Sequence, residues 1–308
     1  MKFHIAINLE RIGPGTDMRA VRDHTLEMVQ MADAAGFEIA WAAEHHALEM
    51  TIAPNPFHLM TWWADHTRRI RVGAGVANAA YWHPIRLAGE AALCDLLSGG
   101  RLEFGLGSGA YQREFDRMFP GLDQKDGWRY MQEMLPLVQR LWAGDVEHDG
   151  TYWQFPKATS CPKPLQENVP VWVAARSPIT FDYAVANDCN IMSWPLTLPF
   201  SEAEKYRGML DDSKARLNPG YRGRFAMMRH TVVYDTDDDR AAGLALHAQL
   251  QHHRLAVLPH RHIGADLAHL RVGEDMAIGP DPARRLPEAM AERQLHALLG
   301  ETDIAGDR

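Results

Sequence analysis

Residues 38–46 read Glu38-Ile39-Ala40-Trp41-Ala42-Ala43-Glu44-His45-His46, a short apolar run that ends in a carboxylate and two adjacent imidazoles. The run is short for a helix, and Gly36 stops the amphipathic stretch before it. We therefore predict the second strand of a βα series here, with His45 at its end, where side chains point into a shared cleft. An imidazole titrates near neutral pH, which makes His45 a candidate for proton transfer. The competing interpretation is a structural or surface histidine pair.

Strands and helices alternate on both sides of this run. Seven strands separated by helices with short turns predict an α/β fold, a TIM-type (β/α) barrel rather than an open sheet. No eighth strand is visible, which leaves open whether the barrel lacks its last strand-helix unit. Strands are predicted at 3–9, 38–43, 70–76, 101–107, 170–176, 190–194 and 225–235. Helices are predicted at about 17–35, from 55, at 83–99, 129–142, from 178, at 201–217 and at 237–255.

Length and composition predict one domain over residues 1–308. A chain of 308 residues, 46% hydrophobic and 23% charged, is long enough to bury one large core. The segment at about 144–169 interrupts the alternation and is expected to be an insertion. The histidine-rich stretch 258–273 has no clear periodicity, so we expect a mobile lid at about 256–280.

Charge and cysteine usage narrow the functional class. A net charge of −8 and a pI near 6.0 provide no basic field for a phosphate backbone, so no nucleic-acid partner is expected. The three cysteines lie far apart with no CxxC spacing, which fits reduced thiols in a cytoplasm. The N-terminus has no signal-peptide pattern, and no apolar run is long enough to cross a bilayer. We expect a cytoplasmic protein without a membrane partner.

The sixteen histidines raise the possibility of a metal site. The clusters His252-His253 and His260-Arg261-His262 have no carboxylate at a ligand spacing, and the chain contains no HExxH motif. We therefore expect no metal and treat these histidines as loop residues.

A glycine-rich segment, Gly105-Leu106-Gly107-Ser108-Gly109, follows the fourth predicted strand. Its spacing is GxGxG, and it does not open the chain's first βα unit, which disfavours a dinucleotide-binding loop. Glycines at this position allow a flat ligand to approach the backbone closely at the mouth of a barrel.

The segment Ala174-Ala175-Arg176-Ser177-Pro178-Ile179-Thr180 places an arginine and two hydroxyls where a strand ends and a helix begins. Free N–H groups, hydroxyls and a guanidinium together suit a phosphate dianion. A simple helix cap with a surface arginine is the equal alternative. Arg129, at the start of the helix predicted at 129–142, is either a second phosphate clamp or a solvated charge. Trp194 ends a strand where it would cover a ring system.

Taken as an ordered set, these motifs resemble the bacterial luciferase-like flavin-dependent monooxygenases over about residues 1–240. The resemblance implies a TIM-like barrel that binds FMN, usually as reduced flavin delivered by a separate reductase, and that uses dioxygen to oxygenate an organic substrate. The segments that carry it are Trp41-x-x-Glu44-His45-His46, His83-Pro84-Ile85-Arg86, Leu96 to Gly109, Val171-Trp172-Val173-Ala174 and Ser193-Trp194.

The resemblance also implies site residues. His45 corresponds to the active-site histidine, with Glu44 and His46 orienting it. Gly75-Val76 falls where the family has a cis peptide bond that does not precede proline, beneath the flavin ring. The other cofactor-binding positions implied are Gly107, Ser108, Tyr111, Arg129, Ala175, Arg176, Ser177, Thr180 and Trp194.

The chain departs from luciferase at several of these positions. Luciferase has a reactive cysteine and an arginine where this chain has Gly107 and Ser108, so light emission from an aldehyde is not implied. Arg176 stands where luciferase has a glutamate, which restores the positive charge lost at Ser108. The final Gly306-Asp307-Arg308 resembles an element that introduces the last helix and strand in relatives.

The expected function is a reduced-FMN-dependent monooxygenase that oxygenates a small hydrophobic or aromatic substrate through a flavin hydroperoxide. A flavin reductase is the expected partner, and the resemblance implies a homodimer through the second and third helices. Two alternatives remain, a deazaflavin-dependent hydride-transfer oxidoreductase and a non-catalytic flavin-binding protein. Residues suited to the substrate, or equally to the core or a dimer interface, are Trp41, Phe57, Tyr81 and Trp82.

Overall fold

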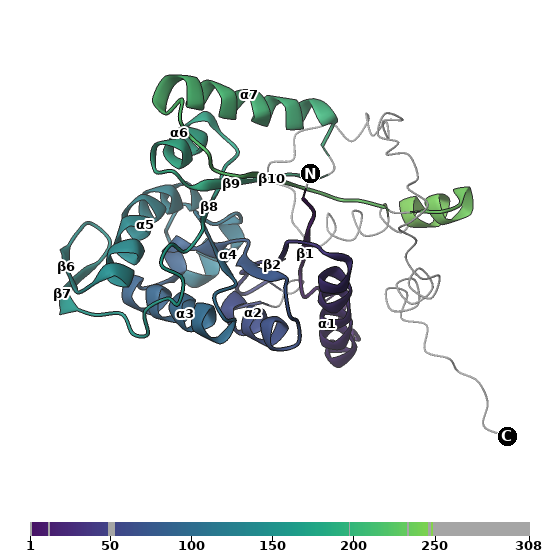
Figure 1. Ribbon diagram of the computed structural model, residues 1–308, viewed down its shortest axis with the longest axis horizontal. Helices are drawn as coiled ribbons and strands as arrows, with labels where there is room; N and C mark the ends of the chain where they lie inside the picture. Colours follow the sequence, from purple (N-terminus) through teal and green to yellow (C-terminus); the bar gives the residue numbers. More distant parts are fainter. Residues whose placement is uncertain are drawn as a thin grey trace. The chain divides into compact units, whose positions relative to one another are not determined.

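The computed structural model describes residues 2–11, 13–48, 53–196, 198–232, 234–245 and 248 (Figure 1). It divides into two compact units, Met1–Met228 and Arg229–Arg308. The first unit holds every predicted site residue. In the second unit, residues 237–245 are helical. The predicted lid at about 256–280 lies outside the described residues, and a single domain over the whole chain stays a prediction.

A parallel sheet forms the centre of the first unit. Every registered strand pair in it is parallel, and the short strand β4 (Ala77–Asn78) pairs with β5 beside the main path. In sheet order the strands are β1 (His4–Ile7), β2 (Ile39–Ala42), β3 (Arg71–Ala74), β5 (Leu102–Gly107), β8 (Val171–Ala174), β9 (Asn190–Leu196) and β10 (Phe225–Arg229).

Contacts between distant strands show that this sheet curls into a nearly closed barrel. A flat sheet would hold β1 and β8, four places apart, at roughly 19 Å, yet the rings of His4 and Trp172 lie 6.2 Å apart. The rings of Trp41 and Trp172 also meet, at 5.2 Å. Arg224, just before β10, reaches Glu38, just before β2, at 3.4 Å. The predicted α/β barrel class is confirmed.

The helices begin and end largely where the sequence predicts. Asp17 accepts hydrogen bonds at the start of α1, and Gly36 ends that helix at a φ of +80°. Asn55 and His83 cap α2 and α3 directly before a proline. The helices are α1 (Met18–Ala35), α2 (Pro56–Asp65), α3 (Pro84–Leu97), α4 (Gln112–Met118), α5 (Gly127–Ala143), α6 (Pro178–Ala186) and α7 (Phe200–Leu217), with short 3-10 turns at Ala79–Tyr81 (η1) and Gln124–Asp126 (η2).

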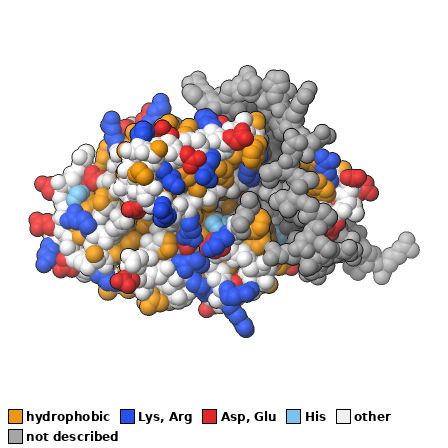
Figure 2. Space-filling view, turned by 45° about the horizontal axis from the view of Figure 1, so that its top comes forward, with side chains coloured by type: hydrophobic (Ala, Val, Ile, Leu, Met, Phe, Trp, Pro, Cys, Tyr) orange, Lys and Arg blue, Asp and Glu red, His pale blue; other side chains and the backbone are white. Residues whose placement is uncertain are grey.

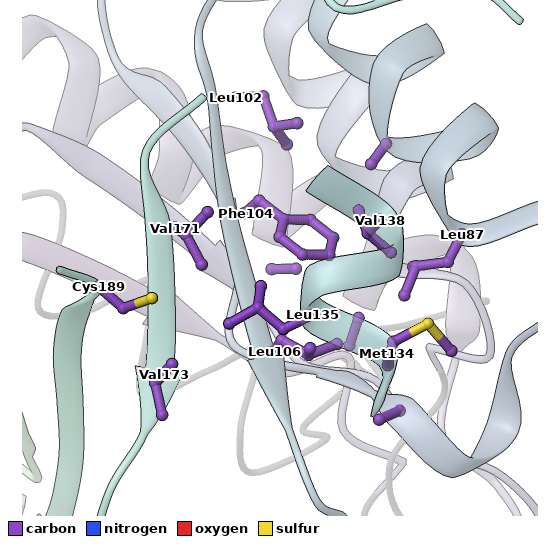
Figure 3. Close-up of a cluster of buried hydrophobic side chains, with 14 of the residues drawn as sticks. Leu87, Leu102, Phe104, Leu106, Met134, Leu135, Val138, Val171, Val173 and Cys189 are labelled. Atoms are coloured by element: carbon purple, nitrogen blue, oxygen red, sulfur yellow. The ribbon is translucent and has the colours of Figure 1, made fainter. Parts of the chain in front are cut away.

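Strand β5 shows how the core is built (Figure 3). Its even-numbered side chains, Leu102, Phe104 and Leu106, are fully buried. They face α5, whose Met134, Leu135 and Val138 belong to the same buried cluster. Each such side chain contributes roughly 1.5–3 kcal/mol by its burial. The odd-numbered positions of the strand point into the barrel. A methyl group on Gly105 would meet the backbone of Ala74, so glycine is needed where the neighbouring strand approaches.

Two sequence predictions need correction. Strand β10 ends at Arg229 and does not run to 235. The segment between β5 and residue 127, for which the sequence predicts no helix, contains helix α4. Its seven residues begin without a side-chain cap, which removes the usual signal for a helix start. Within 144–169 the chain forms an antiparallel pair, β6 (Val146–Asp149) and β7 (Gln154–Ala158), which lies beside α5 in Figure 1.

The surface mixes charge and hydrophobic area. Figure 2 shows acidic and basic side chains scattered over one face, with hydrophobic side chains reaching the surface between them. Elsewhere on the surface, Leu93, Leu96 and Leu97 of α3 are exposed. None of the helices in the described ranges has the length and apolar character needed to cross a membrane.

Candidate active site

The predicted site residues follow the carboxyl ends of the strands, which lie at one edge of a parallel barrel. His45 comes three residues after β2, and Gly75-Val76 directly follows β3. Gly107 is the last residue of β5, and Ala175 directly follows β8. Trp194 lies near the end of β9. The topology therefore brings segments far apart in sequence to one mouth.

His45 is held by a carboxylate that the sequence analysis did not select. Its Nδ1 lies 3.2 and 3.3 Å from the two carboxylate oxygens of Glu114. The same carboxylate accepts the backbone N–H of His46 at 2.6 Å. The Glu114 side chain is completely buried, and that of His45 is 17% exposed. The ring of Tyr111, just before α4, lies 5.3 Å from the imidazole. Helix α4 and the residue before it thus place a carboxylate and an aromatic ring beside His45.

Glu44 and His46 pair with each other and not with His45. The Glu44 carboxylate lies 2.5 Å from Nε2 of His46 and accepts the backbone N–H of Asn78 at 2.7 Å. It also accepts the indole N–H of Trp82 at 2.9 Å. Successive residues of an extended chain point to opposite sides, so Glu44 shares a side with His46. The orienting contact predicted for Glu44 is made by Glu114 instead.

A second group of residues, Val76, Gly107 and Ala174, is closely packed where three strands end, and we call this group the floor. The peptide bond between Gly75 and Val76 is cis, as the resemblance implied. A methyl group on Gly107 would lie 2.5 Å from Cγ2 of Val76 and 3.3 Å from Cβ of Ala174. Three strand ends therefore approach each other with little side-chain volume between them. Val76 and Trp194 both pack against the buried cluster inside the barrel.

This floor fits a flat ring system. Gly107 is buried, and the absence of a side chain there lets Val76 and Ala174 pack directly against the end of β5, so only small side chains lie at this point. Gly127, at the start of α5, packs against the carbonyl of Ser108, which draws that helix toward the loop after β5. The ring of Trp128 then meets Tyr183 of α6 at 5.1 Å. The loop after β5 and the helices α5 and α6 therefore adjoin one another.

The predicted phosphate residues differ in their availability. The Thr180 hydroxyl accepts the N–H groups of Arg176 and Ser177, each at 3.1 Å, and donates to the Ser177 carbonyl. Thr180 is thus occupied by the cap of α6. Arg129 lies 3.6 Å from Asp126. The exposed guanidinium of Arg176 has no recorded ion pair within the described ranges, and of these cations it is the one best placed to bind an anion.

Tyr81, predicted from the sequence only as a substrate-facing or core residue, lies among the side chains around the two carboxylates. Its ring meets His46 at 5.0 Å, Phe115 at 5.2 Å and Phe119 at 5.9 Å. Its hydroxyl is buried without a hydrogen-bond partner in the described part of the chain. Burial, and then the carboxylates of Glu114 and Glu44, raise the pKa of the Tyr81 phenol. The phenol therefore stays protonated beside the two carboxylates.

A sequence signal for Glu114 does exist. Phe115 and Phe119 are spaced as neighbours on one face of a helix, and an acidic residue in a first turn is favoured by the helix dipole. These two features favour a short helix between Gly109 and Gly121.

Comparison with known proteins gives the family. The family model described as luciferase-like monooxygenase matches residues 1–299, beyond the 240 residues of the predicted resemblance. The oxygenase component of the flavin-dependent trigonelline monooxygenase of Acinetobacter baylyi is 42% identical over 240 residues. That match covers 78% of this chain and 67% of the relative.

Solved structures agree on the fold. Monooxygenase RslO1 from Streptomyces bottropensis has a TM-score of 0.75 at 25% identity, over 83% of this chain and 79% of its own. The oxygenating constituent of 3,6-diketocamphane monooxygenase from Pseudomonas putida, in complex with FMN, has a TM-score of 0.67 at 20% identity, over 78% and 69%. A coenzyme F420-dependent tetrahydromethanopterin reductase from Methanopyrus kandleri has a TM-score of 0.62 at 21% identity, over 81% and 72%. The predicted resemblance is confirmed, and the chain belongs to the family of luciferase-like flavin-dependent monooxygenases.

Proposed function

We propose that this protein is the oxygenase component of a two-component monooxygenase that uses reduced FMN from a separate reductase. The observation that carries the proposal is the His45–Glu114 pair, buried at the same barrel mouth as the floor of Val76, Gly107 and Ala174. The relationship to the trigonelline enzyme's oxygenase component supports the same division of labour.

In this proposal each group of residues has one task. The floor and Trp194 hold the flavin ring, and Arg176 binds its phosphate at the start of α6, with Ser177 and Arg129 nearby. Reduced FMN, when bound, supplies the electrons that activate dioxygen. Glu114 occupies Nδ1 of His45, so Nε2 is the atom through which His45 exchanges a proton.

We propose a small aromatic compound as substrate. Aromatic rings lie against the two histidines, Tyr111 against His45 and Tyr81 against His46, and the 38% exposed ring of Tyr111 offers an aromatic surface to a ligand. Such a surface favours stacking with a planar substrate. Trigonelline, named as the substrate of the 42% identical relative, is the first compound to assay.

The alternative of deazaflavin-dependent hydride transfer is supported by the fold shared with the F420-dependent reductase. That likeness concerns the fold alone. The relative at 42% identity is named as flavin-dependent, which favours FMN. A non-catalytic flavin binder would retain the floor and Arg176 without needing the His45–Glu114 pair.

Anaerobic binding followed by oxygen exposure tests the proposal. We expect the protein to bind reduced FMN more tightly than reduced F420. Bound reduced FMN should also reoxidise more slowly than free reduced FMN, because the site excludes water. With trigonelline and related ring compounds present, oxygen uptake should yield an oxygenated product. Preference for F420, or binding of FMN without product across the compound series, would contradict the proposal. The flavin hydroperoxide stays a prediction, and flavin absorbance recorded during the oxygen exposure tests it.

We also propose a homodimer formed through α3. Leu93, Leu96 and Leu97 lie at helical spacing on one face and are 44%, 46% and 57% exposed. Apolar side chains gathered on one helix face are typical of a protein interface.

A further inference from the structure

The two histidines at the end of β2 are each held by a different buried carboxylate, and the two carboxylates have different other ligands. Glu44 binds His46, but it also accepts the N–H groups of Asn78 and Trp82. Those two residues belong to the segment that contains β4 and η1. Glu44 therefore ties the β2 end to that segment, and its oxygens are fully used within the protein.

Among the described residues, the Glu114 carboxylate has hydrogen bonds only to the His45 ring and the His46 backbone N–H. It accepts the backbone N–H of His46 at 2.6 Å and faces Nδ1 of His45 with both oxygens. One oxygen of Glu114 already accepts the His46 backbone N–H, so this side chain acts as a hydrogen-bond acceptor in the site. An ionised carboxylate has no proton to donate, so the proton between it and a neutral His45 belongs to Nδ1.

We propose that Glu114 is the positioning residue of His45, fixing its neutral imidazole as the Nδ1–H tautomer with Nε2 free to act, while Glu44 and His46 form a structural anchor. This assignment rests on the proposed function for its kinetic consequence, and on geometry alone for the tautomer. The backbone of His45 is fixed as well, because its N–H donates to the Ala53 carbonyl at 3.1 Å. The ring of Tyr111 limits rotation of the imidazole from another side.

Glu114→Gln and Glu44→Gln form a matched pair, because both remove charge from a fully buried side chain. In Glu114→Gln the amide oxygen keeps the His46 N–H bond, and the amide NH₂ faces Nδ1 and favours the Nε2–H tautomer. We expect kcat to fall by about 10²–10⁴-fold, the usual contribution of a general acid or base, because His45 would then be held in the wrong tautomer. The KM and the FMN dissociation constant should stay within a few-fold. Glu44→Gln should lower the Tm and leave the His45 tautomer as in wild type.

Nitrogen NMR of protein labelled with ¹⁵N-histidine reads the tautomer directly. Assigned through His45→Ala, the His45 signals should show a protonated Nδ1 in wild type and a protonated Nε2 in Glu114→Gln. An unchanged spectrum in Glu114→Gln, or the same tautomer change in Glu44→Gln, would overturn the inference. This arm needs neither flavin nor turnover, so it separates failure of the inference from failure of the proposed function.

A double variant tests whether Glu114 acts through His45. His45→Ala should bind FMN within a few-fold of wild type and oxygenate much more slowly. Adding Glu114→Gln to His45→Ala should then cause no further loss of kcat, because residues that act as one unit are not additive. Multiplicative losses would show an independent role for Glu114. If Glu114→Gln does not fold, Glu114→Asp, which keeps the carboxylate farther from Nδ1, should give an intermediate kcat with the Nδ1–H tautomer retained.

Discussion

Arg176 is the single cation on which the proposed phosphate site depends most. Its guanidinium is exposed beside the start of α6, whereas Arg129 already lies 3.6 Å from Asp126. We expect Arg176→Ala to raise the FMN dissociation constant by about five- to twentyfold, because one charge-assisted contact at an exposed site is lost. Arg129→Ala should change it by about twofold or less. Fluorescence titration measures both.

Riboflavin is the control for this prediction, because it has the same ring and no phosphate. Its affinity should be equal in wild type and Arg176→Ala. An equal loss for riboflavin and FMN would mean that Arg176 supports the ring or the fold and does not bind the phosphate.

Single residues also show how far the sequence could go. The positions of His45 and Gly107 at strand ends were predictable because each stands in a motif that follows an apolar run, and the structure places Gly107 against Val76 and Ala174. Glu114 was not selected, because its partner lies 69 positions earlier in the chain and α4 brings the two together. Glu44 was assigned to the wrong neighbour because adjacency in sequence hides the alternation of an extended chain.

At the scale of elements, the predictable boundaries were those set by local chemistry. Asp17, Gly36 and the prolines after Asn55 and His83 act on the residues next to them, and the helices begin or end there. Strand β10 was predicted too long, because a run of apolar residues does not reveal where its pairing partner ends.

Asp33 joins two elements and gives a prediction with a defined dependence on pH. Near the end of α1, its carboxylate accepts the N–H groups of Arg68, Arg69 and Ile70 at 3.0, 3.0 and 2.7 Å, in the turn before β3. Burial alone would raise the pKa of Asp33, but these hydrogen bonds outweigh it, and the pKa is lowered from 3.8. A carboxyl group with a lowered folded-state pKa stabilises the fold above its unfolded pKa, and this contribution is lost as the pH falls through the folded value.

Asp33→Asn should therefore destabilise the protein at pH 7 by about 1–3 kcal/mol, the range for hydrogen bonds to a charged group. Urea unfolding from pH 7 to pH 3 should show a constant difference between variant and wild type down to about pH 4, which then narrows. A difference that widens in acid would contradict the sign.

At the scale of the whole first unit, buried charge helps to close the barrel. Glu103, on β5, lies 2.5 Å from both Arg71 of β3 and Arg224 before β10, and it accepts the indole N–H of Trp172 at 2.5 Å. Arg224 also covers the face of Trp172, at 4.6 Å from the ring. The alternation of strands and helices predicted the barrel class. These contacts across its interior could not be predicted, because they depend on which strands face each other after the sheet curls.

The apolar face of α3 carries the last prediction, the state of assembly. If Leu93, Leu96 and Leu97 form the dimer contact, Leu96→Glu should convert a dimer into a monomer, because a charge would be buried in the interface without a partner. Leu217→Glu on α7 is the matched control, since Leu217 and Leu96 are both 46% exposed. Sedimentation velocity at micromolar concentration should show a dimer for wild type and Leu217→Glu and a monomer for Leu96→Glu. A monomeric wild type, or a Leu96→Glu variant that stays dimeric, would exclude α3 as the interface.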